Sequence, residues 1–179
     1  MAVASSVAET TVRSAAAGDE AAFARLIVQH NASMARVAYV IIGEREATLD
    51  AVQAAWTIAW RKLGSLRDAQ QVGPWLIAIA ANEARLHRRR ERRASVVDIS
   101  QAFGQSGAAD PGESASLVDL QRALRRVSPD DRRLLALRFV AGYDSTEIAR
   151  LLGLSASGVR SRLARLIEHL RTDLNEENE

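Results

Sequence analysis

Hydrophobic residues recur every three or four positions over most of this chain, which is the spacing of an amphipathic α-helix. The first such stretch covers residues 19–42, and Gly43 follows it with the conformational freedom that commonly ends a helix. A second predicted helix covers about residues 45–63. A third begins near Pro74, a residue favoured in the first helical turn, and continues to Arg93. These three stretches predict one compact helical bundle.

The helical pattern lapses between Ala94 and Ser116, where Ser, Gly, Gln, Asp and Pro dominate. Such a composition is typical of a flexible linker. Helical spacing resumes at Leu117, and Ser128 followed by Pro129 supplies an N-cap and a first-turn proline, so we expect a second domain of four helices. The expected organisation is an N-terminal tail (1–18), a first domain (19–93), a linker (94–116), a second domain (117–174) and a C-terminal tail (175–179).

The end of the second domain predicts two helices around a tight glycine turn, at about residues 145–167. Ser145 is the expected N-cap of the first helix, Gly153 ends this helix, and Ser155 is the expected N-cap of the second. Leu154 is expected to fill the corner between them. The apolar positions that should face the first helix are Val159, Leu163, Leu166 and Leu170. This layout is typical of a helix-turn-helix.

The opposite face of the second helix is suited to a DNA major groove. Small polar residues near a helix N-terminus let the backbone approach base edges, and arginines bind guanine edges or phosphates as planar bidentate donors. The candidate DNA-reading residues are Ser157, Arg160, Ser161 and Arg165. A helical hairpin with a solvated basic face has a similar pattern, so this alternative stays open.

Two tryptophans lie four residues apart on the second predicted helix. Trp56 and Trp60 would form a contiguous aromatic ridge, with Asp50, Gln53 and Lys62 on the same helix. Large rings flanked by oriented polar groups are typical of a protein–protein hot spot. A tryptophan is also often a core residue, and one ring of the pair can serve each purpose.

The third predicted helix combines groups that bind nucleic acid. An aromatic ring and an amide able to stack on or read bases precede arginines able to bind phosphates. The candidates are Trp75, Asn82, Arg85, Arg88 and Arg89. The preceding loop, residues 64–73, is a candidate cover for an unstacked nucleotide. A solvated helix end whose arginines suit the helix dipole is the alternative.

Composition supports an all-α protein. The chain has 179 residues, of which 47% are hydrophobic and 26% charged, a balance that favours a globular protein. The net charge is only +2, so the clustering of the arginines matters more than the total. There is no cysteine for disulfides or thiolate metal sites. Apolar runs are too short for a membrane span and the N-terminus does not resemble a signal peptide, so we expect a cytoplasmic protein that does not bind membranes.

No catalytic motif stands out. His30, His87 and His169 lack the spacing of a zinc-binding helix, and the chain has neither a phosphate-binding glycine loop nor a nucleophile elbow. We therefore expect no catalytic residue, metal or cofactor, and a protein that is not an enzyme. Two further classes of non-enzymatic protein stay open. One is a stand-alone helix-turn-helix transcriptional regulator, and the other is an adaptor whose arginines bind an acidic protein surface.

The order and spacing of these motifs resemble the bacterial extracytoplasmic-function (ECF) sigma factors. The residues that carry the resemblance are Phe23 to Leu26, Asp50-Ala51-Val52-Gln53 with Trp56 and Trp60, Trp75-Leu76 with Ile79-Ala80 and Asn82, and Glu147-Ile148-Ala149. The resemblance implies two small helical domains, a sigma region two bundle and a region four helix-turn-helix, joined by a flexible linker. It implies promoter DNA and core RNA polymerase as partners, and members of the family often also have an inhibitory anti-sigma factor.

The resemblance also implies a role for each group of candidate residues. The helix from Asp50 to Lys62 would dock on the clamp helices of the polymerase β′ subunit. The segment from Trp75 to Arg93, with the loop before it, would open and hold the promoter minus-ten element. The second helix of the helix-turn-helix would read the minus-thirty-five element, and the outer surface of region four would touch the β flap. Three residues depart from the family pattern: Ala54 after Gln53, Trp56 in place of the more usual phenylalanine, and Gly158 in the recognition helix.

Overall fold

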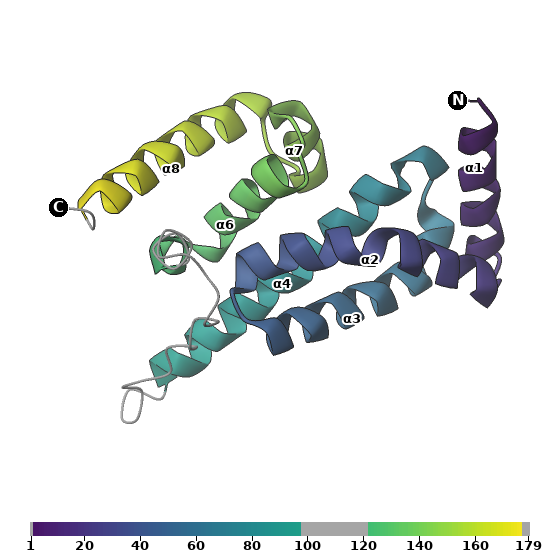
Figure 1. Ribbon diagram of the computed structural model, residues 1–179, viewed down its shortest axis with the longest axis horizontal. Helices are drawn as coiled ribbons and strands as arrows, with labels where there is room; N and C mark the ends of the chain where they lie inside the picture. Colours follow the sequence, from purple (N-terminus) through teal and green to yellow (C-terminus); the bar gives the residue numbers. More distant parts are fainter. Residues whose placement is uncertain (1, 98–121, 177–179) are drawn as a thin grey trace.

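The computed structural model describes residues 2–97 and 122–176, and the regular elements over these residues are all helical, as predicted (Figure 1). The first half contains α1 (Ala2–Ala16), α2 (Glu20–Ile42), α3 (Arg45–Lys62), the short 3-10 helices η1 (Leu63–Ser65) and η2 (Ala69–Gln71), and α4 (Val72–Val97). The second half contains a helical stretch at 122–126, then α6 (Pro129–Leu135), the π-helical turn η3 (Ala136–Val140), α7 (Ser145–Leu152) and α8 (Ala156–Glu176). None of the described helices is both long and apolar enough to cross a bilayer.

Several helix ends follow from local sequence signals. The Asp19 carboxylate accepts a hydrogen bond from the Ala22 backbone N–H at 3.0 Å and caps α2. At the other end, Gly43 adopts a left-handed conformation (φ 79°), and its N–H donates to the Tyr39 carbonyl. Ser128 caps α6 as predicted, because its hydroxyl accepts from the Asp131 N–H at 3.1 Å. These contacts satisfy backbone groups that a helix end leaves without a partner.

Three boundaries differ from the prediction. The N-terminal residues form a complete helix, α1, whose Val12 and Ala15 are buried against the bundle, so this segment belongs to the fold. Helix α4 begins at Val72, before Pro74, and continues to Val97. Its extension is reasonable because residues 94–97 contain neither glycine nor proline. The rest of the predicted linker lies outside the described residues.

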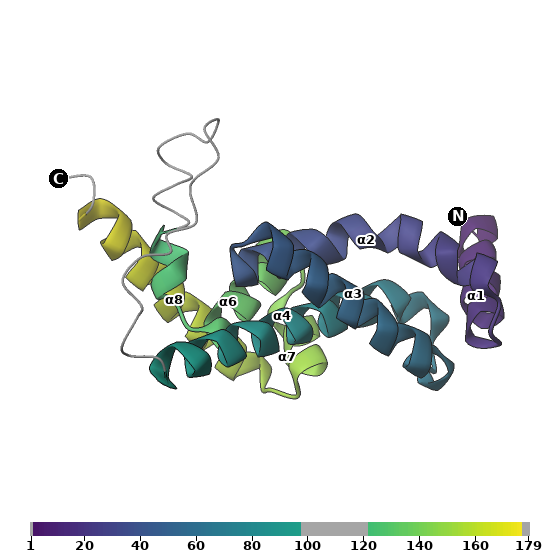
Figure 2. The same cartoon turned by 90° about the horizontal axis from the view of Figure 1, so that it is seen from below.

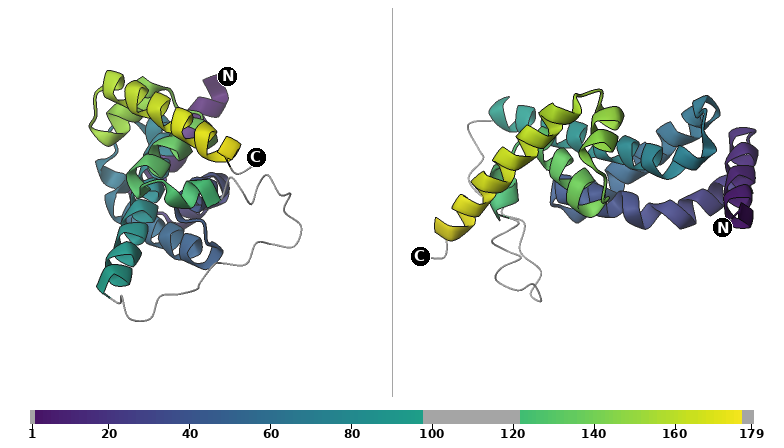
Figure 3. Two further views of the ribbon diagram at one scale, coloured as in Figure 1. Left: turned by 90° about the vertical axis from the view of Figure 1, so that its left-hand side faces the viewer. Right: turned by 90° about the horizontal axis from the view of Figure 1, so that it is seen from above.

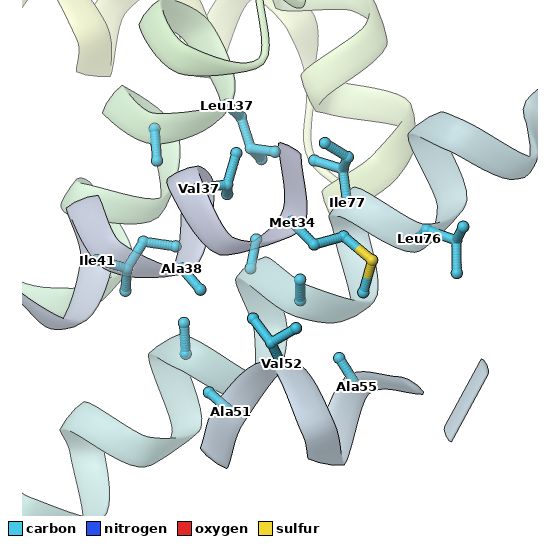
Figure 4. Packing of buried hydrophobic residues seen from close by; sticks show 14 of the residues in the cluster. Met34, Val37, Ala38, Ile41, Ala51, Val52, Ala55, Leu76, Ile77 and Leu137 are labelled. Carbon is cyan, nitrogen blue, oxygen red and sulfur yellow. The ribbon is translucent and has the colours of Figure 1, made fainter. Parts of the chain in front are cut away.

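The two halves of the chain pack against each other around one hydrophobic core. Helix α2 contacts α3 and α4 on one side and α6 and η3 on the other, and α4 also contacts α6 and α7 (Figure 2 and Figure 3). In the core, Met34, Val37 and Ile41 of α2 lie among residues of α3 and α4, and Leu137 of η3 points toward Val37 (Figure 4). The predicted domains therefore share a core rather than standing apart.

Candidate nucleic-acid and polymerase interfaces

The first helix of the helix-turn-helix, α7, begins with a capping box. The Asp144 carboxylate accepts from the N–H groups of Thr146 and Glu147 at 2.7 and 2.8 Å, and the Glu147 carboxylate accepts from the Asp144 N–H at 2.7 Å. These backbone hydrogen bonds lower the pKa of Asp144. The prediction of Ser145 as the N-cap was wrong by one residue, because only Asp144 has a Glu three positions further on.

The turn between α7 and α8 matches the predicted layout except at Leu154. Gly153 is left-handed (φ 67°) and its N–H donates to Ala149, which ends α7. Leu154 is 48% exposed, so the prediction that it fills the corner was wrong. The apolar contact between the two helices comes instead from Ile148 of α7 with Val159 and Leu163 of α8, which are all buried in the core.

The start of α8 gives a physical reason for the glycine at position 158. The Ser155 hydroxyl accepts from the Gly158 N–H at 3.1 Å, which confirms Ser155 as the N-cap. A Cβ atom added to Gly158 would lie only 2.8 Å from this hydroxyl oxygen. A side chain at position 158 would therefore force the Ser155 hydroxyl to shift from its capping position.

The predicted DNA-reading face of α8 is open to solvent. All four predicted residues are exposed: Ser157, Arg160, Ser161 and Arg165. Arg165 donates from Nε to the Ser161 carbonyl at 3.4 Å. Arg162 lies on a different side of the helix, and its Nε donates to Asp131 at 2.5 Å. The four predicted residues thus form one accessible face, while Arg162 joins α8 to α6.

The aromatic ridge of α3 is divided between core and surface. Trp56 is 8% exposed, its Nε1 donates to the Asn31 side-chain carbonyl at 3.0 Å, and its ring meets Phe23 edge-on at 5.5 Å. Trp60 is 40% exposed and meets the same Phe23 ring at 4.8 Å. Trp56 therefore offers a partner little surface and supports the ridge from beneath. The exposed members of the predicted polymerase-binding set are Asp50, Gln53, Trp60 and Lys62.

The predicted minus-ten residues on α4 do not all face solvent. Trp75 is partly buried against the core, whereas Arg89 is exposed. Arg85 is mostly covered: its Nη1 donates to the Asp130 carboxylate of α6 at 3.1 Å, and its Nη2 donates to the Asn82 side chain at 3.3 Å. Part of the candidate nucleic-acid surface thus lies against the second half of the chain.

Arg88 is also partly covered, and it pairs with Glu91 on its own helix at 2.8 Å. It lies near enough to the second half of the chain that its charge contributes to lowering the pKa of Arg132. Arg85 bonds to both Asn82 and Asp130, and Arg88 lies near Arg132, whereas Arg89 is exposed.

Three residues of α6 hold this arrangement together and were not predicted. Asp130 binds Arg85 of α4, and Asp131 binds Arg162 of α8, so adjacent carboxylates engage one arginine from each candidate DNA-binding helix. Arg132, next in sequence, is 1% exposed. Burial lowers the pKa of Arg132 to about 10, with nearby arginines adding to the effect, and the group stays charged at neutral pH.

Over residues 2–97 and 122–176, no group of three or more His, Asp or Glu side chains lies where it could hold a metal ion. The candidate polymerase and nucleic-acid interfaces on α3, α4 and α8 consist of basic, acidic, amide, hydroxyl and aromatic side chains.

Comparison with protein families and with curated relatives gives consistent matches. Residues 26–94 match the family Sigma-70 region 2, and residues 117–170 match Sigma-70, region 4. RNA polymerase sigma factor NccH of Alcaligenes xylosoxydans xylosoxydans is 32% identical over 168 residues, which is 89% of this chain and 90% of NccH. ECF RNA polymerase sigma factor SigM of Mycobacterium tuberculosis is 30% identical over 166 residues, which is 89% of this chain and 84% of SigM. The chain spans only 42% of a third relative, the probable RNA polymerase sigma factor RfaY of Xanthomonas campestris pv. campestris, to which it is 32% identical over 168 residues and 89% of its own length.

Two solved structures share the fold. CnrH, in complex with the cytosolic domain of CnrY, has a TM-score of 0.70 at 24% identity, covering 94% of this chain and 97% of CnrH. The sigma factor RpoE of Bartonella quintana, in complex with the anti-sigma factor NepR, has a TM-score of 0.71 at 24% identity, covering 86% of this chain and 96% of RpoE. Together with the region 2 and region 4 matches and the relatives NccH and SigM, this places the chain in the ECF family of RNA polymerase sigma factors, which direct core polymerase to promoters.

Proposed function

We propose that this sigma factor uses three separate surfaces to initiate transcription: α3 for core polymerase, α4 with the preceding loop for the minus-ten element, and α8 for the minus-thirty-five element. The observation that carries the proposal is the exposed face of α8, the second helix of the helix-turn-helix. Two serines and two arginines lie along the N-terminal half of this capped helix. Two DNA contacts on one chain raise each other's effective concentration, so modest individual affinities suffice for a specific promoter.

The polymerase-binding surface is centred on Trp60. This exposed ring lies among Asp50, Gln53 and Lys62, and the buried Trp56 and Phe23 hold it in place. A rigid aromatic anchor with polar groups around it is the usual anatomy of a protein–protein hot spot. We assign this surface to the clamp helices of the β′ subunit.

The minus-ten surface combines a stacking ring, an amide and basic side chains. Trp75 and Asn82 would serve an unstacked base, and Arg88 and Arg89 the phosphates. Arg85 can join them only when it leaves Asp130, because one guanidinium edge is occupied by that carboxylate. Promoter DNA, a polyanion, competes for the arginine in just this way.

The minus-thirty-five surface reads base edges in the major groove. Arg160 and Arg165 would bind guanines or phosphates, and Ser157 and Ser161 would bind bases or phosphates at close range. The absence of a side chain at Gly158 lets the backbone approach the DNA. The outer surface of this domain would contact the β flap.

The remaining partner is an inhibitor. Because the relatives CnrH and RpoE were solved with the cytosolic domain of CnrY and with the anti-sigma factor NepR, we assign an anti-sigma partner to this chain as well. We further propose that this chain acts by binding rather than by catalysis and needs no cofactor. It would act in the cytoplasm, where polymerase and promoter DNA meet.

The division of roles is tested with two double variants of the full chain. Asp50→Ala with Gln53→Ala should weaken association with core polymerase in a pull-down assay and leave binding to duplex minus-thirty-five DNA unchanged. Arg160→Ala with Arg165→Ala should do the opposite, with a loss of about 1–3 kcal/mol in DNA binding for each bidentate contact removed. Glu168→Ala, on the exposed side of α8, is the control for both assays. The reversed pattern would overturn the assignment of the two surfaces.

A further inference from the structure

The loop between α3 and α4 is supported from behind by the N-terminal part of the chain. Helix α1 lies across the end of the bundle where α3 gives way to α4, and it contacts α2, η1 and η2 (Figure 1 and Figure 2). The loop is the segment that the proposed function assigns to an unstacked nucleotide of the minus-ten element. The segment 64–73 begins at Gly64 and ends at Gly73, which lies in the first turn of α4. Gly64 lies near α1, and Gly73 lies near a side chain of α2.

The end of helix α1 packs beside Gly64, the first of the two glycines. Val12 and Ala15 are buried, and they direct one face of α1 into the bundle. A Cβ atom on Gly64 would lie 3.9 Å from the carbonyl oxygen of Ala16, which is van der Waals contact. The last turn of α1 therefore lies directly against the start of the loop.

The side chain of His30, from α2, packs beside Gly73, the second of the two glycines. A Cβ atom on Gly73 would lie 3.4 Å from His30 Cε1 and 3.8 Å from His30 Nδ1, so the imidazole ring occupies the space beside the backbone where α4 begins. His30 Nε2 is buried and has no hydrogen-bond partner among the described residues. Packing, rather than hydrogen bonding at Nε2, therefore holds this ring against the loop.

Helix α1 contributes little to the central core. The residues that fill the space between α2, α3 and α4 come from those helices, such as Met34, Val52 and Leu76 (Figure 4). Among the side chains of α1 that the structure describes, only Val12 and Ala15 belong to the buried hydrophobic set. Besides α2, helix α1 contacts η1 and η2, so its position bears directly on the loop.

We propose that α1 and His30 form a brace that fixes the conformation of the 64–73 loop and thereby sets its selectivity for the minus-ten element. The inference rests on the proposed function of this loop. Val12 and His30 are positioning residues that act through the loop and do not touch DNA. The two 3-10 turns of the loop are each only three residues long, so an external support reduces the conformations that the loop samples. It thereby keeps exposed side chains, such as Arg67 and Gln71, in one arrangement.

The test measures base discrimination rather than overall activity. Full-length variants are added to sigma-free core polymerase with a selected promoter and with its single-base minus-ten substitutions, and the transcript ratio is measured well below the melting temperature. Val12→Ser and His30→Ala should reduce discrimination at one or more minus-ten positions by about three- to thirtyfold and leave discrimination in the minus-thirty-five element unchanged. His30→Gln, which keeps bulk beside Gly73, should retain most of it. Val28→Ser, the same substitution at a residue of α2 that is 85% exposed, should behave like the wild type.

Two further results separate the brace from the function of the loop. If Val12→Ser and His30→Ala lower the melting temperature but leave every minus-ten ratio unchanged, their role is only structural and the brace is overturned. Arg67→Ala with Gln71→Ala tests the loop itself. If this double variant leaves the minus-ten ratios unchanged, the proposed function of the loop fails, and the inference fails with it. If it changes them while Val12→Ser and His30→Ala do not, only the brace fails.

Discussion

Arg132 of α6 donates from Nη1 to the carbonyl oxygen of Ile41 at the C-terminal end of α2, at 2.8 Å, and so joins region four to region two. The same guanidinium donates to the carbonyls of Val127 and Arg125 at 3.3 and 3.2 Å. The Ile41 carbonyl lies in the last turn of α2, where the helix supplies no donor, and the side chain of Arg132 is buried. One buried cation thus satisfies three backbone acceptors across the junction of the two domains.

Replacing Arg132 should destabilise the whole protein. In Arg132→Met the side chain keeps much of its length, but the three carbonyls lose their donor within a buried region. We expect the free energy of unfolding in urea to fall by about 2–4 kcal/mol. Arg138→Met is the matched control, because Arg138 is exposed and donates to the nearby Tyr143 carbonyl, and it should change the free energy of unfolding by less than about 0.5 kcal/mol. Equal effects of the two substitutions would show that the Arg132 junction contributes nothing of its own.

Removing the Asp130 charge should release Arg85 for DNA. The pair is partly exposed and so contributes at most about 1 kcal/mol, which corresponds to a change of up to about fivefold in affinity. We therefore expect Asp130→Asn to bind single-stranded minus-ten DNA more tightly than the wild type, by up to about fivefold at low salt. Glu168→Gln makes the same charge change on exposed α8 and controls for net charge. An Asp130→Asn affinity no higher than that of this control would mean that the carboxylate does not restrain Arg85.

The two tryptophans of α3 should separate stability from polymerase binding. Trp56→Ala removes a buried ring and its hydrogen bond to Asn31, and should lower the free energy of unfolding by about 3–5 kcal/mol. Trp60→Ala removes an exposed anchor and should weaken binding to core polymerase by about tenfold or more with a smaller loss of stability. Both variants are compared by urea unfolding and by titration with core polymerase. Wild-type polymerase affinity in Trp60→Ala would remove this ring from the interface.

Stability should decline at mildly acidic pH because of His30. Burial lowers the pKa of His30 below its usual value of 6.5, so the native state resists protonation while the unfolded chain takes up a proton near that value. The unfolded state then binds more protons, and the free energy of unfolding falls as the pH drops below about 6.5. Urea titrations between about pH 7.5 and about pH 5.5 should show this slope in the wild type and a smaller one in His30→Gln. His169→Gln, at an exposed position, should keep the wild-type slope. Identical slopes in all three proteins would contradict this role for His30.

Features determined by neighbouring residues could be predicted from the sequence. Ser128 with Pro129 correctly gave the start of α6, and Gly43 and Gly153 correctly gave the ends of α2 and α7. The start of α7 was assigned to Ser145 although Asp144 precedes it, and the decisive signal, Glu147 three residues after Asp144, was present in the sequence. Helix ends are readable because their hydrogen bonds join residues close along the chain.

Features that depend on distant parts of the chain could not be predicted. Arg132 bonds to a carbonyl 91 residues away, and Arg85 bonds to a carboxylate 45 residues away, so neither contact leaves a local pattern. The hydrophobic spacing correctly identified α2, α3 and α4, but it missed α1 and gave no sign of which tryptophan of α3 is buried. The two rings differ in the burial of Trp56 and in its hydrogen bond to Asn31, a residue 25 positions away in the sequence.

The most direct test of the central claim is promoter-selected transcription in vitro. The purified full-length protein is added to sigma-free core RNA polymerase with a library of double-stranded promoter fragments, and the transcript start sites are sequenced. We expect new, defined start sites that share two spaced upstream elements. In the double variant Arg160→Ala with Arg165→Ala, only the minus-thirty-five element should lose its influence on the choice of start site. Binding to DNA without any transcript from these fragments would contradict the account and indicate a stand-alone helix-turn-helix regulator.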